Sequence, residues 1–120
     1  MGLFAPGAAE QAQTVVTGTL AVLNAASAGN PFLGNFNVAV WGTFVGTVSV
    51  EQSFDGGVTW IPTVNKRTGQ LITFTVPSTM QEDEVEPGVL YRVQMTAYTS
   101  GTASYRISEG AAAGDVRRLS

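Results

Sequence analysis

Hydrophobic and polar residues alternate along most of the chain with a period of two. The longest run covers residues 89–98, where every second position is apolar or aromatic and the positions between carry Arg92, Gln94 and Thr96. Comparable runs cover residues 14–24, 35–42, 47–54, 58–61, 70–76 and 102–108. Because successive side chains of a strand point to opposite faces, this pattern predicts about seven half-buried β-strands.

Turn-forming residues separate the predicted strands. Asp55-Gly56-Gly57 predicts a tight hairpin, and Ser100-Gly101 predicts a second one between the last two strands. The chain shows no helical period. These features predict an all-β fold, a single antiparallel β-sandwich of the Ig-like or jelly-roll-like kind, formed by residues 14–108.

The two ends of the chain fall outside this pattern. Residues 1–13 and 109–120 are rich in alanine and glycine without a sustained period, so we expect an N-terminal arm and a C-terminal tail. A frayed terminus is the simpler interpretation of the first segment. The alternative is an arm that lies on a neighbouring subunit, with Leu3 and Phe4 as anchors, and the paired Arg117 and Arg118 are candidate contacts in the tail.

Composition narrows the classes of function. The 120 residues suffice for one domain, and six Lys and Arg against nine Asp and Glu do not provide the basic surface that nucleic-acid binding needs. Histidine and cysteine are absent, which removes the usual general base, the usual zinc ligands and any disulfide. We therefore expect no enzyme activity and no cofactor. The chain contains no run of eighteen apolar residues, so no membrane-spanning segment is predicted.

One short motif stands out at the first hairpin. Ser53, Asp55, Gly57, Thr59 and Trp60 match the Ser-x-Asp-x-Gly-x-Thr-Trp pattern, and so this stretch resembles the Asp-box hairpin of sialidase-type propellers. In that family the boxes are structural and lie far from the substrate, which implies a structural hairpin here. We expect Gly56 or Gly57 to have a positive φ angle and Trp60 to pack over the turn.

The strongest charge cluster consists of four carboxylates, Glu82, Asp83, Glu84 and Glu86. We interpret residues 78–87 as a solvated acidic loop or a docking patch for a basic partner. Calcium binding is the alternative, but the spacing of a calcium loop is missing, so no metal site is assigned.

Aromatic residues offer a further candidate surface. Tyr91 and Tyr105 share the inward parity of their strands and are expected in the core. Trp41 has the outward parity and is the better candidate for partner or weak glycan contact.

A longer resemblance covers residues 36–108. The motifs in order are Gly-Thr-Phe-x-Gly-Thr-Val-Ser-Val-Glu-Gln-Ser-Phe-Asp-Gly-Gly-Val-Thr-Trp, Glu-Pro-Gly-Val-Leu-Tyr-Arg and Tyr-Thr-Ser-Gly-Thr-Ala-Ser-Tyr-Arg-Ile-Ser. This part of the chain resembles small β-rich virion structural proteins of tailed bacteriophages.

The resemblance implies a capsid decoration (cement) protein on the virion surface, assembled in the host cytoplasm. Its partners would be the major capsid protein and further copies of itself in a homo-oligomer, which we expect to be a trimer. The composition of the terminal segments would allow them to lie along exposed sheet edges of neighbours. A head-tail connector or tail accessory protein is an alternative within the virion. A carbohydrate-binding adhesion module that uses Trp41 is an alternative of another class.

Overall fold

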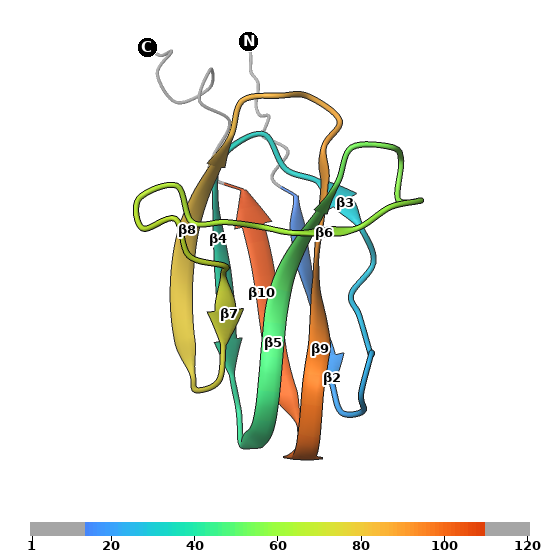
Figure 1. The fold of residues 1–120 in the computed structure, drawn as a ribbon, viewed down its shortest axis with the longest axis vertical. Helices are drawn as coiled ribbons and strands as arrows, with labels where there is room; N and C mark the ends of the chain where they lie inside the picture. Colours follow the sequence, from blue (N-terminus) through green and yellow to red (C-terminus); the bar gives the residue numbers. More distant parts are fainter. Residues whose placement is uncertain (1–13, 110–120) are drawn as a thin grey trace, which may run out of the picture.

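The computed structural model describes residues 14–109, which fold into two antiparallel sheets packed face to face (Figure 1). This arrangement confirms the predicted β-sandwich. Within these residues the strands are β2 (Val15–Leu20), β3 (Asn30–Pro31), β4 (Gly34–Trp41), β5 (Phe44–Ser53), β6 (Ile61–Pro62), β7 (Thr73–Phe74), β8 (Ser78–Glu84), β9 (Leu90–Gly101) and β10 (Ala103–Glu109).

Each sheet has a long central pair of strands. The first sheet has the order β2-β10-β4-β8, so β2 and β8 form its two edges. In the second sheet β9 lies between β3 and β5, and both β6 and β7 pair with the other side of β5. The first hairpin is confirmed, because Gln52 on β5 lies opposite Ile61 on β6. It is less tight than predicted: the returning strand begins at Ile61 instead of Val58, and residues 54–60 form the connecting loop.

The second predicted hairpin is wrong. β9 pairs with β5 in the second sheet, whereas β10 pairs with β2 and β4 in the first, so the turn at Ser100-Gly101 carries the chain from one sheet to the other. The turn is tight: Gly101 has a φ of 87°, and a Cβ there would lie 2.2 Å from the carbonyl oxygen of Thr43. Turn residues of this kind serve a hairpin and a sheet-to-sheet connection equally well.

The core lies between the two sheets and follows the predicted alternation. Its fully buried side chains come from the inward positions of β4, β5, β9 and β10 and include Phe36, Val38, Val48, Val50, Val93, Met95 and Ile107. Phe36 packs against Phe32 and Tyr91, with ring centroids 5.5 and 4.6 Å apart. Tyr91 and Tyr105 are buried, as the parity of their strands predicts.

Four inward assignments fail where the regular ladder ends or becomes irregular. Ala97 is exposed because the β5–β9 pairing contains irregularities, one between Thr47 and Val48, which shift the parity of β9. Val22, Phe54 and Val76 lie beyond the ends of β2, β5 and β7 and are exposed. A period of two in the sequence does not reveal where a strand stops.

Residues 78–87 were predicted as a loop, and this prediction is wrong. Ser78–Glu84 forms β8, which pairs with β4 along its whole length. Met80, Glu82 and Glu84 occupy the inward positions, so carboxylates stand where the pattern normally has apolar residues. The alternation of apolar and polar residues did not predict this strand, because two of its inward residues are glutamates.

The first and last described residues lie together. The carboxylate of Glu109 accepts hydrogen bonds from the backbone N–H groups of Thr14 (3.2 Å) and Leu33 (3.0 Å). β2 therefore begins and β10 ends at the same end of the sandwich (Figure 1). β10 continues to Glu109, one residue into the segment predicted as the tail.

Candidate functional site

The Asp-box hairpin is held by its own polar groups. The Asp55 carboxylate accepts hydrogen bonds from the Ser53 hydroxyl (2.8 Å) and from the N–H groups of Val58 (3.1 Å) and Thr59 (2.8 Å). The Ser53 hydroxyl in turn accepts a hydrogen bond from the N–H of Gly57 (2.8 Å). This carboxylate closes the turn.

Both glycines of the hairpin have the predicted backbone conformation, with φ of 75° at Gly56 and 96° at Gly57. Hydrogen bonds from Thr59, and then from Ser53, lower the pKa of Asp55 to about 2. Asp55 is therefore ionised at neutral pH, and its carboxylate accepts hydrogen bonds from groups of the turn itself.

Trp60 is half-buried beside the hairpin. The guanidinium of Arg92 lies 4.3 Å from the centre of the Trp60 ring, a cation–π contact. Arg92 also donates to the Glu51 carboxylate through Nε (2.8 Å). The ring also approaches Gly29 so closely that a Cβ at residue 29 would lie 2.5 Å from it.

The sequence did not reveal the contact between Arg92 and Glu51. The alternation pattern shows that both residues have the outward parity of their strands. It does not show the register between β5 and β9, because about forty positions separate the two residues in the sequence. In the sheet the two residues are direct cross-strand neighbours. Through its contact with Arg92, Trp60 packs against the two central strands of the second sheet.

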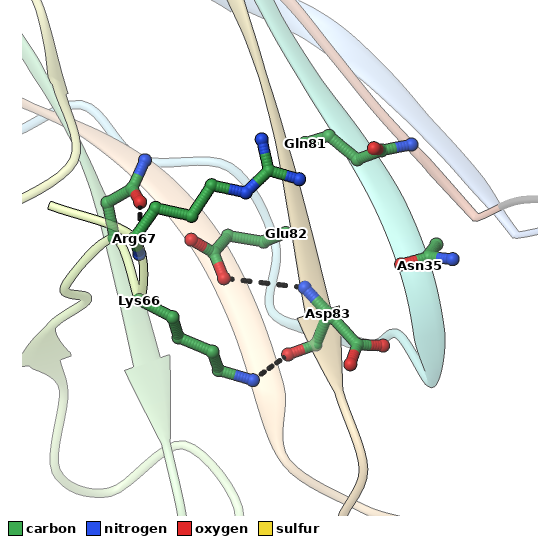
Figure 2. Close-up of a pocket in the computed structure, with 7 residues that line it drawn as sticks. Asn35, Lys66, Arg67, Gln81, Glu82 and Asp83 are labelled. Atoms are coloured by element: carbon green, nitrogen blue, oxygen red, sulfur yellow. Dashed lines mark hydrogen bonds between the residues drawn. The ribbon is translucent and has the colours of Figure 1, made fainter.

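A shallow polar pocket of about 90 Å³ lies where the two sheets meet at β8 (Figure 2). The turn 65–69 between β6 and β7 extends Lys66 and Arg67 towards β8, as Figure 2 shows. Lys66 donates a hydrogen bond from Nζ to the backbone carbonyl of Asp83. The pocket is lined by Asn35, Asn65, Lys66, Arg67, Gln81, Glu82 and Asp83.

The pocket brings two predicted features together. The cations of the 65–69 turn, interpreted from sequence as solvated, lie beside the acidic segment and balance part of its charge. The pocket is much smaller than the pockets that hold drug-sized molecules, which have volumes of about 300 Å³ or more. Its contacts instead attach the second sheet to an edge of the first.

The four acidic residues do not act as one cluster. Glu82 and Glu84 are buried, with 7% and 9% of their surfaces exposed, and Asp83 points to the opposite face of β8. Glu84 accepts a hydrogen bond from the Tyr91 hydroxyl. Burial first, and the neighbouring Glu84 second, raise the pKa of Tyr91 well above its usual range.

Glu86 lies beyond β8, is exposed, and donates its N–H to the Glu84 carboxylate (3.0 Å). Among residues 14–109 no three acidic, histidine or cysteine side chains are arranged to hold a metal ion. Alternation along β8 explains why four neighbouring carboxylates do not converge.

Trp41 is the most solvent-accessible aromatic ring of the sheets. It lies at the end of β4 on the outward face of the first sheet and is 45% exposed. Trp60 lies in the loop just before β6 of the second sheet, and Tyr91 and Tyr105 are in the core, so the aromatic residues do not form one platform. Leu3, Phe4, Arg117 and Arg118 lie outside the described residues.

Comparisons of the chain with family models, with curated proteins and with solved structures gave no match. Among the described residues there is no helix with the length and apolar character needed to cross a bilayer.

Proposed function

We propose that this protein is a non-catalytic structural protein of a tailed-phage virion, a decoration protein that binds the outer surface of the head and stabilises it. The proposal rests on the order of motifs in residues 36–108, which resembles small β-rich virion proteins. That stretch supplies most of the sandwich, from β4 to nearly the end of β10. A rigid β-module of this size suits a structural subunit.

The carboxylates support a structural rather than a catalytic role. Asp55 accepts three hydrogen bonds inside its turn, Glu51 pairs with Arg92, and Glu84 accepts from Tyr91. Each of these carboxylates accepts hydrogen bonds from groups within the fold. A pKa of about 2 also makes Asp55 a poor proton donor at neutral pH.

The position of the described ends supports attachment through the terminal segments. Glu109 binds the N–H of Thr14, so residues 1–13 and 110–120 both start from one end of the sandwich. Two segments that leave from one place can contact the same partner. With several copies in a homo-oligomer, a trimer in our proposal, individually weak contacts to the major capsid protein would add up to firm attachment.

The test is to mix the purified full-length protein with shells that lack it and to image the particles. We expect density spread over the shell lattice. The variant with Leu3→Ala and Phe4→Ala should attach less, whereas Trp41→Ala should attach as the unchanged protein does. Density at the portal vertex alone would favour a head-tail connector, and a lack of density would contradict attachment to the virion shell.

Trp41 supports one second candidate, a carbohydrate-binding adhesion module. An exposed indole on the outer face of a sheet can stack on a sugar ring, and Trp41 is 45% exposed. A glycan array decides between the two functions. Strong binding to a glycan that is lost in Trp41→Ala would favour adhesion.

A further inference from the structure

The outer edges of the two sheets differ in how they are protected from pairing with another strand. β3 and β6 contain Pro31 and Pro62, which lack a backbone N–H, and β3, β6 and β7 are each only two residues long. β8 is longer, but it carries Glu82, Asp83 and Glu84 and receives a hydrogen bond from Lys66 on the carbonyl of Asp83. Short strands, proline and charges are the usual means of protecting an edge.

β2 has none of these features. Its six residues, Val-Val-Thr-Gly-Thr-Leu, contain no charge and no proline, and within residues 14–109 it pairs only with β10. Val15 is 42% exposed, and Thr17 and Thr19 are exposed as well. β2 is therefore a regular edge strand whose other side is open among the described residues.

The hydrogen bond at the start of β2 shows which backbone groups face this open side. The N–H of Glu109 donates to the carbonyl of Thr14 (3.0 Å), so the backbone groups of Thr14 point towards β10. In an antiparallel ladder this direction alternates from residue to residue. The N–H and C=O groups of Val15, Thr17 and Thr19 consequently point away from the sheet.

We propose that β2 is a self-association edge, which pairs antiparallel with β2 of a second copy about a twofold axis at Thr17. In this register Thr17 lies opposite Thr17, and Val15 lies opposite Thr19 of the other copy. All three outward residues then form hydrogen-bonded pairs, with six backbone hydrogen bonds in total. A shift by two residues in either direction leaves two such pairs and four bonds, so the Thr17-centred register satisfies the most backbone groups.

The chemistry of β2 fits a second copy of itself. A twofold contact places each side chain against the same set, and a charged edge would then oppose like charges. β2 has no charge to oppose. Its outward face would bring threonine against threonine and valine against threonine, which are favourable cross-strand neighbours.

The pairing is expected to be weak in dilute solution. One strand edge of six residues provides far less than the roughly 1,200 Å² of a typical stable interface. Association should therefore depend on protein concentration. The inference does not rest on the proposed virion function, since it uses only the edges of the described sandwich.

Cysteine cross-linking tests the register, because the chain has no cysteine of its own. In Thr17→Cys the two sulfurs belong to directly opposed residues with Cα atoms about 5.5 Å apart, a distance that a disulfide spans. In Thr19→Cys the two identical residues are four positions out of register, about 14 Å apart. Under copper-phenanthroline oxidation of the full-length protein, we expect Thr17→Cys to form covalent dimers at least tenfold faster than Thr19→Cys.

A mixed experiment sharpens the result. Val15→Cys and Thr19→Cys should cross-link poorly alone and rapidly when mixed, because these residues oppose each other. Equal rates for Thr17→Cys and Thr19→Cys would overturn the proposal. A terminal segment of a neighbour laid along β2 would also keep the two copies of residue 17 apart and produce that contrary result.

A charge substitution provides an independent measurement. Thr17→Lys places two ammonium groups opposite each other, so concentration-dependent association in sedimentation should be lost while the thermal midpoint changes little. The matched control is Thr79→Lys, an exposed threonine on β8, the other edge of the same sheet. If both variants associate as the unchanged protein does, β2 is not the contact.

Discussion

The two edges of the first sheet differ although the strands are of similar length. β8 has an acidic inward face, a pocket of mixed charge beside it and Lys66 bound to one of its carbonyls. β2 lies at the opposite side of the same sheet (Figure 1). It is uncharged and consists of valine, threonine, glycine and leucine residues. The difference teaches that edge protection in this molecule is selective, and that the unprotected edge is the natural place for a partner.

The largest expected effect comes from β2 itself, where Gly18 lies beneath the Tyr105 ring. A Cβ at residue 18 would lie 2.4 Å from the Tyr105 hydroxyl oxygen and 2.8 Å from Cζ, so a side chain there must displace a buried ring. We expect Gly18→Val to lower the free energy of unfolding by about 3 kcal/mol, the upper part of the range for overpacking. Urea denaturation measures this change.

Tyr105→Phe provides the control for that prediction. It removes the closest atom, so part of the lost stability should return in the double variant Gly18→Val/Tyr105→Phe. If Gly18→Val leaves the urea midpoint unchanged, β2 is not packed on Tyr105 as described.

At the β8 side, the next largest effect is expected from Tyr91→Phe. Removal of the hydroxyl takes a hydrogen-bond donor from the buried Glu84 carboxylate, which should cost about 1–2 kcal/mol. The matched control is Tyr98→Phe, whose hydroxyl donates to an exposed backbone carbonyl and whose loss should cost less.

The same tyrosine predicts a dependence on alkaline pH. Its pKa is raised in the folded protein by burial and by Glu84, above the ordinary value of 10.0, so the folded state holds the proton more tightly than the unfolded state. This contribution to stability is complete below pH 10 and decreases as the pH rises further. Tyr91→Phe should make the decrease shallower; Tyr105, whose pKa is also raised by burial, accounts for part of what remains.

The fold was largely predictable from sequence, and the failures have physical causes. Alternation identified the inward valines of β5 and the inward residues of β9 as far as Met95, and Asp55-Gly56-Gly57 identified the hairpin. Alternation could not identify β8, because Glu82 and Glu84 occupy its inward positions and are accommodated at the end of the core by partners such as Tyr91. Polarity alone does not separate a solvated carboxylate from one that is hydrogen-bonded inside the fold.

The candidate site was less predictable than the fold. Trp41 was correctly placed on the outside, since its parity is a local property. The pairs Glu51–Arg92 and Lys66–Asp83 depend on which strands and turns become neighbours, and this is set by the topology of the two sheets. Long-range register is the information that one sequence does not contain.

The smallest effect is expected for Lys66→Ala. Lys66 is exposed, so loss of its contact with the Asp83 carbonyl should change the free energy of unfolding by no more than about 0.5 kcal/mol. The self-association of this variant should also stay as in the unchanged protein, because the three carboxylates of β8 remain and still protect that edge. A new, concentration-dependent dimer in sedimentation would show instead that Lys66 alone protects this edge.

Hydrogen exchange measured residue by residue on the full-length protein, at low and at high concentration, tests the contrast between the two edges most directly. The account predicts that the N–H groups of Val15, Thr17 and Thr19 exchange rapidly in dilute solution and become protected as the concentration rises. The N–H groups along the outer side of β8 should show no such change. Protection that appears equally at both edges, or at neither, would contradict the claim that β2 is the edge this protein leaves open for a second copy.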